Sequence, residues 1–293
     1  MAIAQINRLA LWVLRHTSDG FYVRFMHYLP LLKGRWPGIL HIRRPRTLTE
    51  KIQYLKINIE QLIPDAHIYA DKLAVRDYVA DTIGEQHLIR LLGSWERAEH
   101  IDWPALPDQF VIKANHGAAF NIIVNDKTKL DTAAATTQLN EWLAIDYSQR
   151  GRENHYRNIP PRLLAEALLD SGYESPPEYK FRCFDGKCEI VTVTIDRYTD
   201  PKRLIVDTAW NRLPVELDYP QPAREIEKPA VLDSMVSIAE TLAAPFFYVR
   251  VDLYEVEGSI YFSELTFTPL GGTVPFSPPE WNRKLGDLLH LPQ

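Results

Sequence analysis

The sequence has no long apolar run, no repeats and few cysteines. The longest apolar stretch near its start, Leu9 to Leu14, is far shorter than the roughly 18 residues of a membrane-spanning helix. It also lacks the small-residue cleavage site of a secretory signal. We therefore expect a protein that stays in the cytoplasm. The absence of internal repeats and low-complexity segments excludes repeat architectures.

The two cysteines, Cys183 and Cys188, flank Asp185 and Gly186, a pair of residues typical of two-residue hairpin turns. Such a turn places the two thiols opposite each other across the strands. Because the cytoplasm is reducing, we expect two reduced, partly buried thiols rather than a disulfide. Two sulfurs in so short a span do not predict a metal site.

Negative charge is scarce in the first 46 residues. The chain has a net charge of −5, but residues 1–46 carry eight Lys or Arg against Asp19 alone, which gives +7 there and −12 for the rest. Aromatic residues are interleaved with these cations. Two interpretations stay open: a solvated helical surface over an aromatic core, or a surface that contacts an anionic membrane or an acidic polymer. The acidic remainder argues against nucleic-acid binding.

The order of the elements predicts an α+β fold with antiparallel sheets. Thr47 and Glu50 form the capping box of a helix over 47–62. Further helices are expected over 71–84, 132–148 and 229–244, and strands over 88–92, on both sides of a loop within 108–130, over 190–197, and on both sides of a turn in 250–266. Helices and strands are segregated, which argues against a doubly wound parallel sheet.

We expect three parts in the chain: a basic, mainly helical region 1–70, a first α+β part 71–165 and a second α+β part 166–293. The stretch 172–181 is rich in Pro, Gly and Ser and is expected to be a linker. The segment around Glu166, "PPRLLAEALLD", is short and apolar, and no element is assigned to it.

The hairpin in 250–266 places charged residues on one face of a sheet. A three-residue loop, 257–259, pairs Val256 with Ile260 and therefore Asp252 with Glu264 and Arg250 with Thr266. Two carboxylates that face each other repel unless a cation neutralises them. Two interpretations stay open: a Mg²⁺ site with Arg250 beside it, or a solvent-exposed face on which Arg250 simply pairs with the carboxylates.

Lys113 ends a strongly apolar strand, just before a loop of small residues over 115–119. Backbone N–H groups and an ammonium in this arrangement are suited to a polyphosphate. The loop is not a Walker motif, and a plain hairpin stays an alternative. Lys72 and Glu166 are each compatible with an ordinary surface position.

Taken in chain order, these residues resemble the ATP-grasp fold of ligases: "DK" at 71–72, "FVIK" at 110–113 before a flexible loop, "AEALL", and "RVDL" followed by "FSELTF". The chain is more similar still to the TupA-like ATP-grasp family of teichuronopeptide and capsular polysaccharide synthesis. The matching blocks are "RPRTLTEKIQYLK", "DKLAVRDYV", "LPDQFVIKANHG", "EYKFRCFDGK" and "ELTFTPLGG". The resemblance covers nearly the whole chain and implies two α+β subdomains that grip ATP between antiparallel sheets.

The resemblance also implies roles at the positions that match. The residues expected to contact ATP are Lys72 and Lys113 at the phosphates, Asn115, His116 and Gly117 in a lid over 115–121, Glu166 with the backbone of Ala167 and Leu168 at the adenine, and Asp170 at the ribose. Lys180 and Arg182 are expected at a phosphate or the substrate. The loop has one glycine where several are usual.

For the metal, the resemblance implies Asp252 and Glu264 as Mg²⁺ ligands, with Thr266 in the place of the usual asparagine. Arg250 is expected to stabilise the transition state, with Lys113 as a second catalytic residue.

The implied activity is an ATP- and Mg²⁺-dependent carboxylate–amine ligase, in which phosphoryl transfer from ATP gives an acyl phosphate that an amine attacks. The expected substrates are a uronic acid of a surface polysaccharide or its precursor and an amino acid or other amine. The basic N-terminal region is the candidate for peripheral contact with the inner face of the membrane. Two alternatives stay open: a glycosyltransferase of polysaccharide synthesis, and a non-catalytic nucleotide-binding module.

Overall fold

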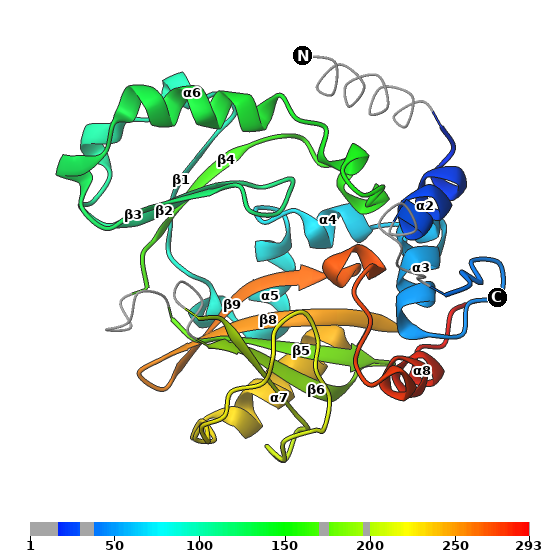
Figure 1. Ribbon diagram of the computed structural model, residues 1–293. Coiled ribbons are helices and arrows are strands. Elements are labelled where there is room, and N and C mark those ends of the chain that lie inside the picture. The colour runs from blue at the N-terminus through cyan, green and yellow to red at the C-terminus, as the bar shows by residue number, and fades with distance from the viewer. Residues whose placement is uncertain (1–16, 30–37, 170–175, 196–199, 293) are drawn as a thin grey trace.

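The computed structural model describes residues 17–29, 38–169, 176–195 and 200–292, and its strands form two antiparallel sheets (Figure 1). The first sheet has the spatial order β1-β4-β2-β3, with β1 (Leu91–Trp95), β2 (Phe110–Ala114), β3 (Asn121–Val124) and β4 (Leu163–Ala167). The second has the order β7-β6-β5-β8-β9, with β5 (Glu178–Phe184), β6 (Lys187–Ile195), β7 (Lys202–Val206), β8 (Tyr248–Val256) and β9 (Ser259–Thr266). The predicted α+β class is therefore confirmed.

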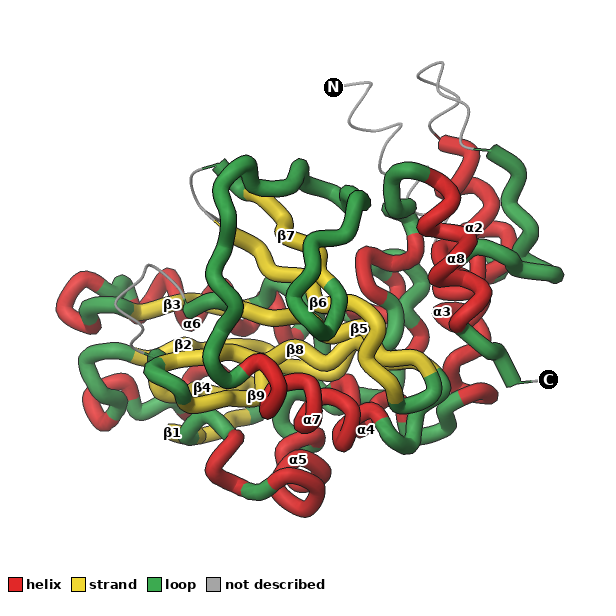
Figure 2. The backbone as a smooth tube through the Cα atoms, turned by 90° about the horizontal axis from the view of Figure 1, so that it is seen from below, coloured by secondary structure: helices red, strands yellow, loops and turns green. Residues whose placement is uncertain are grey.

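Helices cover both sheets and gather at one end of the molecule. The helices are α2 (Asp19–Tyr28), α3 (Leu48–Leu62), α4 (Ala66–Ala70), α5 (Val75–Ile83), α6 (Thr132–Leu143), α7 (Leu232–Ala243) and α8 (Pro279–Leu288). Leu139 of α6 packs into the core of the first sheet. Met235 of α7 and Leu55 of α3 are buried in the larger core of the second sheet. Figure 2 shows α2, α3 and α8 side by side at one end. Among the described residues, no helix has the length and apolar character to cross a bilayer.

The helix expected over 71–84 begins only at Val75. Residues 71–74 form turns instead, because Asp71 Oδ1 accepts a hydrogen bond from the Leu73 backbone at 2.8 Å. The helix expected to reach residue 148 ends at Leu143, and Asp146 caps a separate short turn through Ser148. The capping box of Thr47 and Glu50 is present at the start of α3, as predicted.

The strands also differ in part from the expected ranges. The first strand, expected over 88–92, is β1 at Leu91–Trp95, and the unassigned apolar segment forms β4. The expected linker 172–181 contains the start of β5 at Glu178, while its residues 172–175 lie outside the described part. The three-part division of the chain stays a prediction, and β4 crosses the boundary drawn at residue 166.

The hairpin of β8 and β9 has the predicted pairing at the site but a different turn. Asp252 is opposite Glu264 and Arg250 is opposite Thr266. The turn contains two residues, Glu257 and Gly258, with φ angles of 51° and 80°, so the expected three-residue loop is wrong. A β-bulge supplies the missing residue: the pairing shifts after Asp252, which leaves Ser263 as the extra residue on β9.

Cys183 and Cys188 are opposite each other across β5 and β6, next to the turn at Asp185 and Gly186. Both are free cysteines, as predicted, and both are buried.

Candidate functional site

Arg250 and Asp252 form the centre of the charged face on the second sheet. Both lie on β8, two residues apart, and therefore point to the same side of the sheet. Arg250 Nε and Nη2 donate to Asp252 Oδ1 and Oδ2, each at 2.6 Å. Asp252 has no exposed surface. Burial alone lowers the pKa of Arg250, but the Asp252 and Glu264 carboxylates outweigh burial and raise it above its ordinary value, so the guanidinium stays charged.

Lys180 on β5 joins this pair to a third carboxylate. Its Nζ lies 2.6 Å from both Asp252 Oδ2 and Glu178 Oε2. Ser263, the bulge residue, donates to Glu178 Oε1 at 3.2 Å. Sequence reasoning missed Glu178, since it was placed in a linker, and missed Ser263, since no bulge was expected.

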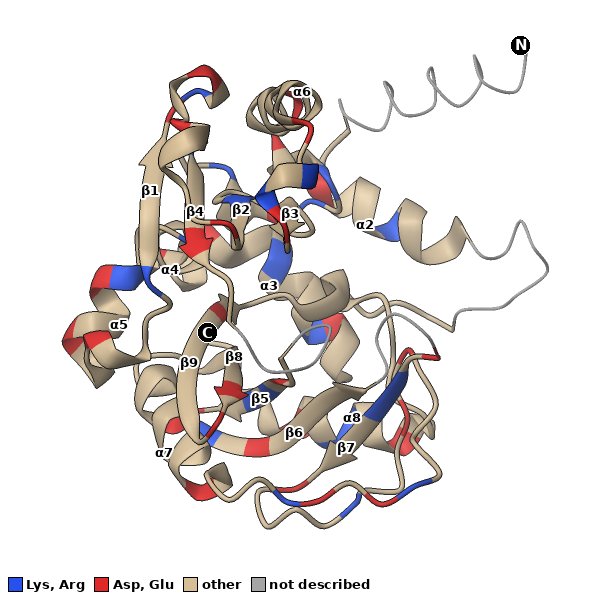
Figure 3. Ribbon diagram, turned by 90° about the vertical axis from the view of Figure 1, so that its left-hand side faces the viewer, with Lys and Arg blue, Asp and Glu red and all other residues tan. Residues whose placement is uncertain are grey.

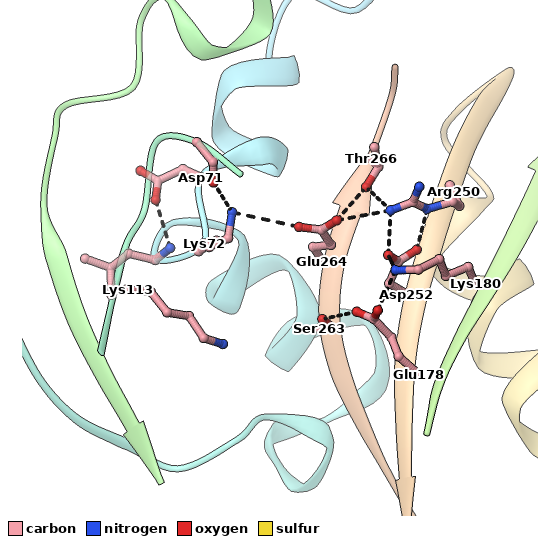
Figure 4. Close-up of polar contacts among 12 residues, drawn as sticks. Asp71, Lys72, Lys113, Glu178, Lys180, Arg250, Asp252, Ser263, Glu264 and Thr266 are labelled. Carbon is pink, nitrogen blue, oxygen red and sulfur yellow. Dashed lines mark hydrogen bonds and ion pairs between the residues drawn. The ribbon is translucent and has the colours of Figure 1, made fainter. Parts of the chain in front are cut away.

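Glu264 connects the second sheet to the lysine of the "DK" segment. Its Oε1 accepts from Arg250 at 3.1 Å and from the Thr266 hydroxyl at 3.0 Å, and its Oε2 lies 3.8 Å from Lys72 Nζ. Burial raises the pKa of Glu264, but Lys72 and Arg250 outweigh it and hold the pKa below its ordinary value. Figure 4 shows Lys72 between Glu264 and the residues of the first sheet.

Lys113 and Glu166 form a second charged group, on the first sheet. Lys113 Nζ lies 2.7 Å from Glu166 Oε2, and Arg76 Nη1 of α5 lies 2.9 Å from Oε1. Arg76 also donates to the Ile89 carbonyl at 2.8 Å. Sequence reasoning missed Arg76, although its position four residues after Lys72 was a possible signal. Charged positions on β2 and β4 thus lie across from those on β5 and β8 (Figure 3).

The loop between β2 and β3 is held by contacts to Lys72 and to aromatic rings. Lys72 Nζ donates to the Gly117 carbonyl at 2.7 Å. Asn115 Nδ2 donates to Asp71 Oδ1 at 2.8 Å. His116 is buried, with Nε2 at 3.2 Å from the Trp142 carbonyl, and burial lowers its pKa.

Gly117 is needed for close approach rather than for a positive φ. A Cβ at this position would lie 2.6 Å from the Tyr147 ring and 2.9 Å from the Phe120 ring. The single glycine of the loop is therefore packed under aromatic side chains. The role of the loop as a moving lid stays a prediction.

Of the four remaining predicted residues, the structure describes Ala167, Leu168 and Arg182. The Ala167 backbone N–H donates to the Arg90 carbonyl at 2.9 Å, and the Leu168 side chain is half-buried. Asp170 lies outside the described residues. Arg182 lies on β5, buried, opposite Arg250. The expected adenine, ribose and phosphate contacts stay predictions.

A buried lysine and a half-buried glutamate of distant segments hold the loop that follows β9. Lys56 Nζ of α3 donates to the Gly271 carbonyl at 2.9 Å, and the Thr268 hydroxyl donates to Glu153. Burial lowers the pKa of Lys56 to about 8 and raises that of Glu153 above its ordinary value. Leu270 and Gly271 have φ angles of 54° and 58°. The contacts from Lys56 and Glu153 therefore stabilise a strained loop next to Thr266.

The carboxylate oxygens of Asp252 and Glu264 that still have free lone pairs suit a Mg²⁺ ion with few protein ligands. Asp252 Oδ2 already accepts from Arg250 and Lys180, whereas Oδ1 accepts once, and Glu264 Oε2 has only the 3.8 Å contact with Lys72. Because a carboxylate oxygen has two lone pairs, both side chains retain acceptor capacity. Mg²⁺ typically uses one or two carboxylates and fills its octahedron with water and phosphate oxygens.

The described residues contain no cluster of three or more His, Cys, Asp or Glu side chains arranged for a metal, so a closed protein cage is not indicated there. The Thr266 hydroxyl accepts from Arg250 at 3.0 Å and donates to Glu264 at 3.0 Å. These two bonds give Thr266 a role in orienting Arg250 and Glu264. Its expected role as a metal ligand stays a prediction.

Comparisons with known proteins place this chain among ATP-grasp proteins. A search of curated proteins found no match. Matching solved structures include the ATP-grasp ligase PsnB with a minimal precursor, Mg and ADP, at 15% identity and a TM-score of 0.38, over 70% of this chain and 52% of that chain. The D-alanine–D-alanine ligase from Bacillus anthracis with ATP matches at 17% identity and a TM-score of 0.39, over 69% and 54%.

The N5-carboxyaminoimidazole synthase from Aspergillus clavatus matches at 12% identity and a TM-score of 0.40, over 70% of this chain and 45% of that chain. This chain thus spans about half the length of these three proteins. The model of the TupA-like ATP-grasp family matches residues 50–290, and the chain belongs to that family.

Proposed function

We propose that this protein is an ATP- and Mg²⁺-dependent carboxylate–amine ligase. One observation carries the proposal: Lys72 Nζ lies 2.7 Å from the Gly117 carbonyl of the first sheet's loop and 3.8 Å from Glu264 on the second sheet. A polyphosphate at this point meets an ammonium, a packed loop and a carboxylate with free lone pairs. Phosphoryl transfer is catalysed mainly by such positioning and charge.

The residues around this point have complementary tasks. Lys72 and Lys113 offset the negative charge of the phosphates. Asp252 and Glu264 hold Mg²⁺, which, when bound, supplies positive charge that polarises phosphoryl oxygens. Arg250 is fixed by the two-point contact with Asp252, and its Nη1 makes no hydrogen bond to a described residue. This nitrogen is therefore free to donate to the oxyanion that develops when an amine attacks the activated carboxylate.

The proposed substrates are a uronic acid of a surface polysaccharide or its precursor and an amino acid or other amine. Membership of the TupA-like family supports this substrate class. The proposed product is an amide, formed through an acyl phosphate. The reaction belongs on the cytoplasmic side of the membrane, where ATP is available.

The two alternatives account for fewer of the contacts. A glycosyltransferase that uses a nucleotide sugar has no need for lysines at 72 and 113, yet each of them lies in a charged group on one of the facing sheets. A non-catalytic nucleotide-binding module has no need for Arg250 beside the metal carboxylates. Release of ADP that depends on both an acid and an amine separates the ligase from both alternatives.

The test compares two isosteric substitutions on the same hairpin. Glu264→Gln removes the charge that faces Lys72, and Glu257→Gln changes an exposed residue of the turn. ADP release is measured over a panel of uronic acids and amino acids, with circular dichroism as the test of folding. We expect Glu264→Gln to abolish ADP release and Glu257→Gln to retain it. Release by Glu264→Gln at the wild-type rate refutes the metal assignment.

We also propose peripheral contact with an anionic membrane, through a surface formed by α2 and residues 38–46. The Leu40 backbone donates to Tyr28 Oη at 3.2 Å, and Val23, Leu40 and Ile42 form a small shared core. Half of the ten exposed large apolar residues among those described lie here: Phe21, Phe25, Met26, Leu29 and Ile39. The exposed cations of this surface are Arg24, Arg43, Arg44 and Arg46.

This combination favours the membrane interpretation over a solvated helix. A solvated helix face exposes polar residues, whereas this surface exposes apolar side chains flanked by arginines. Apolar side chains enter the boundary between headgroups and acyl chains, and arginines bind anionic headgroups. We therefore propose that this surface contacts an anionic lipid membrane.

A further inference from the structure

Arg182 is a buried cation without a carboxylate partner at the centre of the second sheet. It lies on β5, directly opposite Arg250 on β8, so the two guanidinium groups share one face of the sheet. Like charges in this arrangement destabilise a sheet. The charge of Arg250 is offset by Asp252 and Glu264. Arg182 is 3% exposed, it forms no ion pair with a carboxylate in the described part of the chain, and its Nε has no hydrogen-bond partner there.

The groups around Arg182 are also unsatisfied. Arg182 Nε, Tyr248 Oη and Thr192 Oγ1 are buried atoms without a hydrogen-bond partner. Tyr248 lies two residues from Arg250, and Thr192 is opposite Lys180, so both side chains point to the face that carries Arg182. Leaving a buried donor or acceptor unpaired is costly, and native proteins do so rarely. Two such hydroxyls on the sheet face that carries one unpaired guanidinium nitrogen point to a ligand that carries acceptor oxygens.

The other cations of this face have partners. Lys180 contacts Glu178 and Asp252, and Arg203 Nε lies 3.0 Å from Asp218. Burial lowers the pKa of Arg182, and the cations Arg250 and Arg203 also lower it, while Tyr248 and Asp252 offset part of this effect. A guanidinium nevertheless remains protonated in proteins. The uncompensated charge is thus a feature that binding of an anion would neutralise.

The position of Arg182 separates it from the nucleotide phosphates. Glu264 lies on β9, Arg250 on β8 and Arg182 on β5, so two strand spacings, about 10 Å, lie between Glu264 and Arg182. An anion at Arg182 is therefore distinct from a phosphate held at Glu264 and Lys72. Phe276 belongs to the segment that follows the strained loop at Leu270. The centroid of its ring lies 5.2 Å from Cζ of Arg182, so the ring covers this guanidinium group.

We propose that Arg182, with the hydroxyls of Tyr248 and Thr192, binds an oxyanion of the acceptor substrate, a carboxylate or phosphate group separate from the carboxylate that reacts beside Arg250. Access requires the Phe276 ring to turn aside. The substrate assignment rests on the proposed ligase function, whereas the anion site itself does not. The ligase thus selects an acceptor that carries a second negative charge.

The first test is the stability of the protein without ligand, measured as the melting temperature in chloride buffer. Arg182→Met keeps most of the side-chain volume and removes the uncompensated charge, so we expect its melting temperature to rise. Arg203→Met is the matched control on the same sheet. Because it removes the partner of Asp218, we expect its melting temperature to fall. A fall in Arg182→Met as large as in Arg203→Met overturns the proposal.

The second test is binding of the probes inorganic phosphate and acetate, read as the rise in melting temperature at matched ionic strength. We expect one or both probes to stabilise the wild type. We expect Arg182→Met to bind the effective probe about tenfold to a hundredfold more weakly, which corresponds to the loss of charge-assisted hydrogen bonds. Arg182→Lys is expected to retain part of the effect.

The outcomes distinguish a phosphoryl group from a carboxylate as the bound anion, and they test the anion site separately from the ligase function. Stabilisation by phosphate alone identifies a phosphoryl group, and stabilisation by acetate alone identifies a carboxylate. No stabilisation of the wild type by either probe, or an equal shift in Arg182→Met, overturns the anion site. If the protein releases no ADP with any acid and amine, but phosphate or acetate raises its melting temperature in a way that depends on Arg182, the ligase function is refuted and the anion site is supported.

Discussion

Lys113 and Glu166 lie on adjacent strands of the first sheet and form an ion pair with a separation of 2.7 Å between Nζ and Oε2. Arg76 holds the other oxygen of the same carboxylate at 2.9 Å. Glu166 therefore keeps a cationic partner when Lys113 is removed or moves. This arrangement leaves Lys113 free to move toward a phosphate without leaving a buried carboxylate unpaired.

Lys113→Met is expected to weaken ATP binding by about tenfold or more, through loss of a charge-assisted contact, while the melting temperature changes little. Binding is measured by calorimetry with a non-hydrolysable ATP analogue and Mg²⁺. Arg76→Met is the control. It removes contacts to both Glu166 and the Ile89 carbonyl, so we expect it to lower stability. Unchanged nucleotide affinity in Lys113→Met contradicts the phosphate role.

Gly117→Ala is expected to displace the loop between β2 and β3, because the added Cβ would lie 2.6 Å from the Tyr147 ring. Overpacking of this kind costs about 1–3 kcal/mol. The shift also breaks the bond from Lys72 to the Gly117 carbonyl, so nucleotide affinity is expected to fall. Tyr147→Ala in the same chain removes the Cδ2 and Cγ atoms of Tyr147 that lie 2.6 and 2.9 Å from the added Cβ. A double-mutant cycle by urea unfolding is expected to show coupling, and simple additivity would argue against the clash.

Buried His155 is expected to make stability depend on pH. Burial lowers its pKa to about 3, and Lys72 contributes. The unfolded chain, with a His pKa of about 6.5, therefore binds more protons between these two values. Stability rises with pH through this window and falls on acidification, by up to about 1.4 kcal/mol per pH unit.

The measurement is urea unfolding at pH 7, 6 and 5. From pH 7 to 5, the wild type is expected to lose about 2 kcal/mol more than His155→Gln, which lacks the titrating group. His100→Gln, at an exposed position, is expected to keep the wild-type dependence. If His155→Gln follows the same pH curve as the wild type, the buried neutral imidazole is not the cause.

The α2 surface is expected to bind anionic vesicles. Replacing Phe21 and Phe25 by serine removes apolar area from a surface on which they are 53% and 40% exposed. We expect the double substitution to weaken co-sedimentation with phosphatidylserine-containing vesicles by about tenfold or more, with little binding of any variant to neutral phosphatidylcholine. Ile123→Ser is the control, since this residue is 39% exposed on β3, away from α2. Equal sedimentation of both variants would exclude the α2 surface as the contact.

Local sequence patterns predicted the central pairings of the site but not the turn beside them. Side chains alternate along a strand, so Arg250 and Asp252 share a face whatever the turn, whereas a pairing shifted by one residue would place Glu264 on the other face. The predicted turn was one residue too long and the predicted strands lacked the bulge at Ser263, and the two errors cancel. The bulge does change the hydrophobic pattern, because the buried apolar residues Phe262 and Leu265 are three positions apart, so the sequence contained a signal for it.

The partners that the predicted residues find in distant segments came only from the tertiary structure. Arg76 is 90 residues from Glu166 in the chain, and Lys56 is 215 residues from Gly271. Strand order and helix packing decide such contacts, and a single segment carries no record of which distant segment it meets.

The sequence by itself determined which residue types share a face and the order of the family's motifs. Only the tertiary structure decided that Asp252 contacts two cations, Lys180 and Arg250, while Arg182 has no carboxylate partner among the described residues. The physical reason is that charge balance in a buried site depends on neighbours from several strands.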